Sequence, residues 1–272
     1  MSRRWYQVAV ADGTTTTIAA AEGSHPGEAI VAATARLGRK AAVWPAAVAV
    51  APGADIPLGE SVGRGVVVVG AGPAALAGFE YPAGVVAALG ERARAALAPG
   101  RTRVRTDDGH AIEAVVAGAA VRELFLDVVE RLDAVDNIEV TVAEHLDPGG
   151  EREVWLTPRL RDVRRAIRFL DDFDDDCLSS GHVDVGVYVR SPRSTWRLTQ
   201  HKTLVWLSDD DALTARVEGW LAARGVDPRE PLATVASGPH VHYRGARSSA
   251  RPRLLARLKS AGLRRVDVPP PP

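Results

Sequence analysis

Residues 182–207 read HVDVGVYVRSPRSTWRLTQHKTLVWL, and this stretch contains the clearest secondary-structure signal in the chain. Valines at every second position from Val183 to Val189 alternate with polar residues, as expected for a strand with one buried and one solvent-facing side. Pro192 supplies turn chemistry, and Trp196 and Leu198 then continue the alternation over residues 195–207. The stretch predicts an antiparallel hairpin with an apolar buried face. Its polar face carries Tyr188, Arg190, Arg197 and His201.

The second half of the chain shows a pattern that repeats. An apolar stripe with helical spacing runs from Val121 to Leu132 and precedes strand-like segments at residues 137–145 and 152–158. A second stripe over residues 163–173 precedes the hairpin. The strings Val154-Trp155-Leu156-Thr157 and Val205-Trp206-Leu207-Ser208 stand at corresponding places in the two units. The pattern predicts two α-β-β units, which form a four-stranded antiparallel sheet backed by helices and extended by an α-β-α segment.

The N-terminal part predicts a smaller, β-rich unit. Residues 5–23 favour a hairpin around Asp12-Gly13, residues 24–38 a short helix, and residues 41–53 a strand with Pro45 inside it. This β-β-α-β order is similar to the opening of a β-grasp fold, an analogy at the level of the fold alone. Residues 83–100 then predict a helix, and residues 101–118 a hairpin that turns at Asp108-Gly109.

The chain is therefore expected to belong to the α+β class, with mainly antiparallel sheets. We predict a β-rich N-terminal domain at residues 1–108, an α+β domain at residues 109–268 and a Pro-rich tail at residues 269–272.

Composition indicates a cytoplasmic bacterial protein. Only Lys40, Lys202 and Lys259 are lysines among 34 basic residues, and alanine is abundant, which suggests a GC-rich coding bias. Cys177 is the single cysteine, so a disulfide framework and a cysteine-based zinc site are excluded. The first residues lack a secretory apolar region, and no run approaches the ~20 apolar residues of a membrane span.

Charge is balanced overall but unevenly distributed. Residues 107–180 carry 19 acidic and 8 basic residues, a net charge of −11, whereas residues 190–265 carry 15 basic and 6 acidic residues, a net charge of +9. This distribution favours two segments whose charges offset each other; the alternative is a basic surface for an anionic partner. We expect the acidic run at residues 171–176 to be offset by nearby arginines, because carboxylates at a helix C-terminus repel the helix dipole.

The segment VVVVGAGPAA at residues 66–75 resembles the dinucleotide fingerprint of FAD- and NAD-binding flavoproteins. The resemblance implies that Gly70 and Gly72 let the backbone approach a pyrophosphate at a helix N-terminus. The context favours an apolar strand followed by a turn instead. Gly78 and Pro82 interrupt the helix that should follow, and no acidic residue ends a strand about 20 residues later.

His240 and His242 lie two residues apart on a predicted strand, so both imidazoles are expected on one face. Together with His201, or with His182 and Asp184, they could form a metal site or an acid–base cluster. No local motif supplies a third ligand, and we favour a solvated strand face without metal. No G-x-S-x-G or P-loop motif is present, so the sequence predicts neither catalytic residues nor a cofactor.

These observations favour a non-enzymatic binding, adaptor or regulatory protein. Its basic and aromatic sheet face would contact an acidic protein partner through six residues: Tyr188, Arg190, Arg197, His201, His240 and His242. Two alternatives stay open. One is a nucleotide- or flavin-binding enzyme that uses Gly70 and Gly72. The other binds RNA or single-stranded DNA, because nine basic residues accompany the aromatic ones. These residues are Arg190, Arg193, Arg197, Lys202, Arg244, Arg247, Arg251, Arg253 and Arg257.

Overall fold

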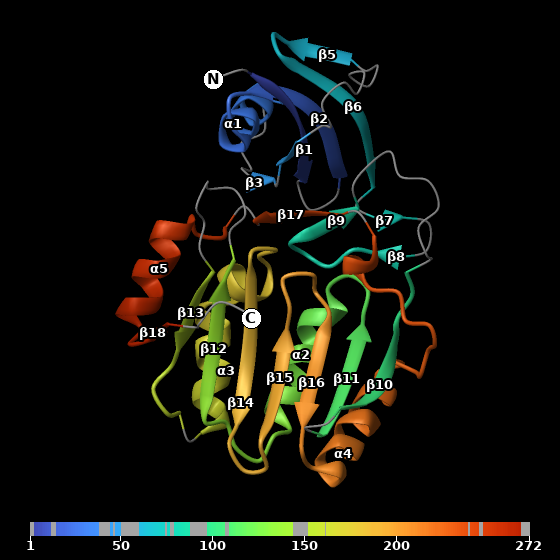
Figure 1. The fold of residues 1–272 in the computed structure, drawn as a ribbon, viewed down its shortest axis with the longest axis vertical. Helices are drawn as coiled ribbons and strands as arrows, with labels where there is room; N and C mark the ends of the chain where they lie inside the picture. The colour runs from blue at the N-terminus through green and yellow to red at the C-terminus, as the bar shows by residue number, and fades with distance from the viewer. Residues whose placement is uncertain are drawn as a thin grey trace.

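The computed structural model describes residues 3–11, 15–37, 44–45, 47–49, 60–73, 75–76, 79–87, 97–106, 109–143, 152–160, 162–238, 240–244 and 247–267. It is an α+β protein in which helices pack against antiparallel sheets (Figure 1), as predicted. The largest sheet has eight strands, rather than the four predicted, in the order β10-β11-β16-β15-β14-β12-β13-β18. The strands are β10 (Gly100–Thr106), β11 (Gly109–Val115), β12 (Asn137–Val142), β13 (Glu153–Leu156), β14 (Val183–Val189), β15 (Ser194–Leu198), β16 (Leu204–Ser208) and β18 (Arg264–Val266).

Three helices share a core with one face of this sheet: α2 (Ala120–Glu130), α3 (Val163–Asp172) and α4 (Asp211–Ala222). Figure 1 shows α2 and α3 behind the sheet. Two buried indoles connect the layers, because Trp196 Nε1 donates to the Phe125 carbonyl and Trp206 Nε1 donates to Thr214 Oγ1, each at 3.1 Å. The predicted stripe is confirmed, because all six of its apolar residues are buried: five on α2 (Val121, Leu124, Phe125, Val128 and Val129) and Leu132 just after the helix ends.

The remaining helical elements flank this core. A π-helical turn (Asp174–Leu178) follows α3, a short 3-10 helix (Val235–Ser237) precedes the last strands, and α5 (Arg251–Ser260) buries Leu254 and Leu258 in the same core. The edge strand β18, which the sequence does not predict, pairs with β13. Of the helices in the described part of the chain, none is long and apolar enough to cross a membrane.

The predicted alternation in the hairpin is confirmed for β14 and β15. All four valines of β14 are buried together with Trp196 and Leu198, whereas Tyr188 and Arg197 are partly exposed. The prediction of one long strand over residues 195–207 is wrong, because the chain reverses at residues 199–203 and returns as β16. The inward positions 196, 198, 204 and 206 are all even, so the five-residue turn preserves the period of two and leaves no break in the pattern.

This extra reversal also changes the predicted repeat. Trp155 lies on β13, the second strand of its unit, and β13 pairs with β12 and β18. Trp206 lies on β16, the third strand after α3, and β16 pairs with β15 and β11. The two Val-Trp-Leu strings therefore do not occupy corresponding places in the sheet, and the internal repeat itself stays a prediction.

The N-terminal part forms a five-stranded antiparallel sheet with the order β4-β1-β2-β6-β5. Its elements are β1 (Arg4–Ala11), β2 (Thr15–Gly23), α1 (Pro26–Arg36), β4 (Ala47–Ala49), β5 (Glu60–Gly63) and β6 (Val66–Pro73). Helix α1 packs Ile30 and Ala33 against Val8 and Ala19 of the sheet. The predicted β-β-α-β order is present, and the β-grasp analogy stays a prediction.

A small sheet joins the two larger ones. Strand β17 (His240–Arg244) lies between β3 (Trp44–Pro45) and β9 (Val85–Ala87), and β7 (Ala75–Leu76) pairs with β8 (Phe79–Glu80). The prediction of a helix at residues 83–100 is wrong for Val85–Ala87, because these residues pair with β17 as a strand. Residues 88–96 of the predicted helix lie outside the described part.

The predicted domain division at residues 108/109 stays a prediction. Strand β10 precedes it but belongs to the eight-stranded sheet, and β17 follows it but pairs with β3 and β9. The hairpin predicted at residues 101–118 is confirmed by the pairing of β10 with β11; of its predicted turn residues, Asp108 is outside the described part, whereas Gly109 begins β11. The predicted tail at residues 269–272 also lies outside it.

Candidate functional site

The hairpin presents a row of side chains on the sheet face opposite α2 and α3. Tyr188 on β14 pairs with Thr195 on β15, and Thr195 pairs with Leu207 on β16. Cross-strand partners project to the same face of a sheet, so these three residues define what we call the open face. Trp206 next to Leu207 points into the core, whereas Leu207 is 45% exposed. A large apolar side chain is therefore available on this face.

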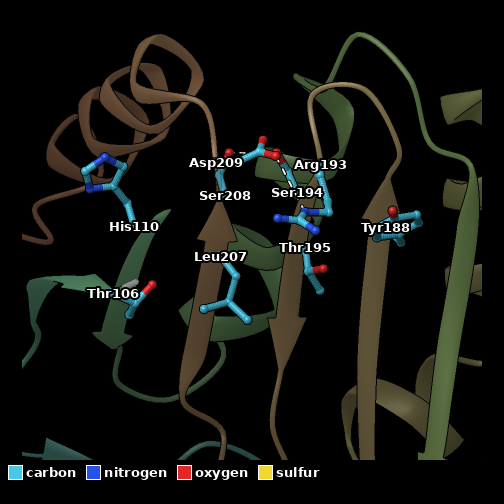
Figure 2. A pocket seen from close by; sticks show the side chains of 9 residues that line it. All are labelled: Thr106, His110, Tyr188, Arg193, Ser194, Thr195, Leu207, Ser208 and Asp209. Atoms are coloured by element: carbon cyan, nitrogen blue, oxygen red, sulfur yellow. Dashed lines mark hydrogen bonds and ion pairs between the residues drawn. The ribbon is translucent and has the colours of Figure 1, made fainter. Parts of the chain in front are cut away.

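A hollow of about 460 Å³ lies where this row reaches the ends of the strands, and we call it the hairpin hollow (Figure 2). Its lining residues are Thr106, His110, Tyr188, Arg193, Ser194, Thr195, Leu207, Ser208 and Asp209. At its rim the exposed Arg193 Nε lies 3.5 Å from Asp209 Oδ2. Below them, Ser194 and Ser208 share a buried hydrogen bond of 2.8 Å between their hydroxyls. The hollow thus combines the aromatic ring of Tyr188, the apolar side chain of Leu207 and the exposed guanidinium of Arg193.

Of the six predicted contact residues, only Tyr188 lines this hollow, and the two predicted arginines are engaged elsewhere. Arg197 donates to Glu139 Oε1 at 2.8 Å, across Gly186, which has no side chain to intervene. Arg190 is exposed, and its backbone N–H donates to Asp136 Oδ2 at 2.9 Å. This hydrogen bond, followed by the Arg159 side chain, lowers the pKa of Asp136. Arg190 and Arg197 therefore contribute to local structure in ways that the alternation does not reveal.

The basic residues of the C-terminal third do not form one free face in the described structure. Arg251 pairs with Glu153 at 2.7 Å, Arg247 lies 3.4 Å from Asp175, and Arg257 pairs with Asp176. Lys202 and Arg244 are buried, so neither presents its charge on an open surface. The expectation that the acidic and basic segments offset each other is confirmed by these pairs, and the acidic run is held by arginines as predicted.

Three predicted histidines come together. His201 lies in the turn between β15 and β16, whereas His240 and His242 lie on β17; one donor atom from each falls within 4.8 Å of the others. Among the described residues, this is the group of three or more histidine, cysteine, aspartate or glutamate side chains that lies close enough together to hold a metal ion. The expectation of a solvated strand face is wrong for His242, which is only 7% exposed.

His182 belongs to the same region. As a polar residue in alternation with the valines of β14, His182 is predicted to lie on the polar side of the hairpin, but it is 1% exposed, and its ring centroid lies 6.0 Å from that of His242. The reason is that β17 reaches the end of β14, as the bond between His242 Nδ1 and the Gly181 carbonyl shows. A strand pattern gives the face of a residue but not what a distant segment places over it.

The neighbouring Lys202 is fully buried and has a left-handed backbone with φ 60°. Its ammonium donates to the Leu178 carbonyl at 2.9 Å and to the Ser180 carbonyl at 2.6 Å, and burial lowers its pKa to about 8. Cys177, on the same side of the core, is also buried, and burial raises the pKa of its thiol far above the usual range. A buried thiol of this kind is a poor nucleophile.

Gly70 and Gly72 lie inside β6, opposite Ile18 and Thr16 of β2. The dinucleotide fingerprint requires a strand, a tight turn and then a helix. Here both glycines are inside a paired strand, and the next described elements are the strands β7 and β8. The geometry that lets glycines approach a pyrophosphate is thus not formed at these positions.

Of the residues that line the hairpin hollow, only Tyr188 and Arg193 are among the candidates predicted from the sequence. His110 on β11 meets Leu207 on β16 and Asp209 just after β16 because these two strands are neighbours. The one local signal was Leu207, an apolar residue at an outward position beside Trp206. Comparisons with protein-family models, curated proteins and solved structures found no match to this chain.

Proposed function

We propose that this chain is a binding or adaptor protein that takes an acidic side chain of a partner protein in the hairpin hollow. The observation that carries the proposal is the hollow of about 460 Å³, whose lining brings together Tyr188, Leu207 and the Arg193–Asp209 pair (Figure 2). Leu207 and Tyr188 offer apolar contact area, and the other seven lining residues are polar or charged groups that can form hydrogen bonds with a partner. Aromatic and arginine residues supply most of the energy of protein interfaces.

The rim supports recognition of a carboxylate. Arg193 and Asp209 are both exposed and 3.5 Å apart, and a pair of this kind contributes about 0–1 kcal/mol. A carboxylate of the partner can therefore replace Asp209 at little cost. Tyr188 and Leu207 would contact an apolar side chain next to that carboxylate. The expected motif is an acidic residue beside an apolar one.

The same rim argues against the nucleic-acid alternative. Binding to a phosphate backbone needs several cations that each neutralise one phosphate. The described lining of the hollow contains one arginine, and Arg197, Arg247, Arg251 and Arg257 pair with carboxylates elsewhere. A single carboxylate fits this arrangement better than a polyanion.

The test is a selection of random peptides displayed on phage against the full chain. We expect enriched peptides to contain Asp or Glu next to an apolar residue, and Arg193→Ala and Leu207→Ser each to weaken their binding about tenfold. Asp209→Asn should strengthen it, because the competing carboxylate is removed. Arg264→Ala, an exposed arginine on β18, is the matched control and should leave the affinity unchanged.

Two results would overturn the proposal. One is a selection that enriches no acidic peptide. The other is equal binding of the enriched peptides to the chain and to Arg193→Ala and Leu207→Ser. The proposal also keeps the cytoplasmic location expected from the sequence, which fractionation of the producing cell tests.

A further inference from the structure

Four histidines converge at the junction between the eight-stranded sheet and the small sheet. The chain has seven histidines, and His182, His201, His240 and His242 meet here from three separate segments. The ring of His201 lies 4.8 Å from that of His240 and 4.9 Å from that of His242, and the latter two are 4.8 Å apart. The three rings therefore form a nearly equilateral triangle.

The hydrogen bonds of the two β17 histidines determine where their protons are. His240 Nδ1 lies 2.7 Å from the Gly238 carbonyl, and His242 Nδ1 contacts the Gly181 carbonyl. A carbonyl oxygen can only accept, so both Nδ1 atoms must carry the proton. In each neutral ring the lone pair is then on Nε2.

These two lone pairs are directed at each other. His240 Nε2 and His242 Nε2 are 2.9 Å apart. With both protons on Nδ1, neither neutral ring has a hydrogen to donate across this gap. Two acceptors at this distance repel unless a cation or an additional proton lies between them.

We propose that His201, His240 and His242 bind one divalent transition-metal ion of the zinc class. A zinc–imidazole bond is about 2.0–2.1 Å long, so two nitrogens 2.9 Å apart subtend an angle of about 90° at a shared ion. A tetrahedral site needs this gap to open by only a few tenths of an ångström. His201, whose donor atom is within 4.8 Å of the others, completes the set by a small rotation of its ring.

The surrounding structure holds the ligands in place. Each β17 histidine has its second nitrogen fixed by a backbone carbonyl, which is the outer-shell arrangement usual for metal-bound imidazole. The turn that carries His201 is closed by Thr199 N–H to the Thr203 carbonyl at 3.0 Å and by Lys202 N–H to the Thr199 carbonyl at 2.9 Å. His201 therefore projects from a structured turn rather than from a loose loop.

The donor set decides the class of metal. All three ligands are imidazoles, which suit zinc, copper, nickel and iron, whereas magnesium and calcium prefer oxygen ligands. Three protein ligands also leave a fourth position for water or for a ligand from solution, since His201 and His240 are partly exposed.

The test uses the full chain without an affinity tag, stripped of metal with a chelator. Isothermal titration with ZnCl₂ should give one ion per chain, whereas MgCl₂ should give no heat. Zinc at 100 times its dissociation constant should raise the melting temperature by roughly 5–10 °C. The variants His240→Asn and His242→Asn place an amide N–H near the position of Nδ1 and remove Nε2. Each should weaken zinc binding by more than the roughly 10–100-fold typical of an outer-shell change.

His110→Asn is the matched control, because His110 pairs with Asp211 away from the cluster, and it should keep the wild-type affinity. Should an Asn variant fail to fold, ¹⁵N spectra of the imidazoles in the unmodified chain serve instead. Zinc should shift the Nε2 resonances of His240 and His242 and leave both Nδ1 atoms protonated. The proposal would be overturned if the chain bound no zinc at micromolar concentration, or if both Asn variants bound zinc as tightly as the unmodified chain. The 2.9 Å contact between His240 Nε2 and His242 Nε2 would then be explained by a proton shared between the two rings.

Discussion

Gly84 is the position at which one methyl group should do the most damage near the histidine cluster. It precedes β9 and has φ +97°, a conformation that L side chains rarely adopt. A Cβ there would lie 2.5 Å from the Gly181 backbone nitrogen, 2.8 Å from the Ser180 carbonyl carbon and 2.9 Å from Lys202 Cε. Two of these three atoms belong to the backbone and cannot rotate away.

The magnitude follows from two terms. Backbone strain for a non-glycine residue at such a φ costs about 1–3 kcal/mol, and overpacking of a filled site costs about 1–3 kcal/mol more. Gly84→Ala should therefore lower the free energy of unfolding by roughly 2–6 kcal/mol. Gly225→Ala is the matched control, because Gly225 has φ +74° with nothing within 4 Å of the added methyl. It should cost only the strain, about 1–2 kcal/mol.

Urea denaturation of both variants measures the difference. Because the Ser180–Gly181 segment also carries the carbonyl that accepts from His242 Nδ1, Gly84→Ala should weaken zinc binding, and Gly225→Ala should not. Equal losses of stability in the two variants would refute the close approach of β9 to residues 180–181 and, with it, this account of how His242 is oriented.

Three further predictions concern the core of the eight-stranded sheet. Arg257→Ala should lower the stability measured by thermal unfolding by about 3–5 kcal/mol, because it leaves the fully buried Asp176 carboxylate without its cation. Arg247→Ala removes an exposed ion pair instead, and it should lower the stability by less than about 1 kcal/mol. In urea titrations, Trp206→Phe should lower the free energy of unfolding by about 1 kcal/mol more than Trp155→Phe does, because Trp206 Nε1 donates to the buried Thr214 hydroxyl and Trp155 Nε1 makes no such bond. Equal losses of stability in the two variants would contradict this. Asp136→Asn should lower the free energy of unfolding by about 2 kcal/mol at pH 7, because Asp136 accepts hydrogen bonds from Arg190 and Arg159. Since the pKa of Asp136 is lowered in the folded protein, this loss of stability should be complete above the unfolded pKa of 3.8 and should shrink as the pH falls below it. A loss of stability that does not change with pH would contradict the assignment.

Local periodicity predicted the elements that are stabilised by their own amphipathic pattern. The stripe from Val121 to Val129 is the buried face of α2, and the valines of β14 are core residues. Both patterns are read within a dozen residues, and both faces are buried by the same large core. The reversal at residues 199–203 was not predictable in this way, because its five residues keep Leu198 and Leu204 in phase.

The candidate sites depend on contacts that no local pattern encodes. Strand β17 reaches the histidine turn because it pairs with β9, whose own valines resemble the start of a helix in the sequence. The hairpin hollow exists because β16 pairs with β11, about ninety residues earlier in the chain. Sequence spacing put His240 and His242 on one strand face, but only the three-dimensional neighbourhood shows that His201 faces them.

The two proposed sites lie at opposite ends of the same two strands. The hollow includes Ser194 and Ser208, where β15 begins and β16 ends, whereas His201 lies in the turn that connects the other ends. Five residues of strand separate them, about 16 Å at roughly 3.3 Å per residue. Substitutions this far apart without shared partners usually act additively. A loss of zinc binding in His240→Asn should therefore leave peptide binding at Arg193 unchanged, so that each function stands or fails on its own residues.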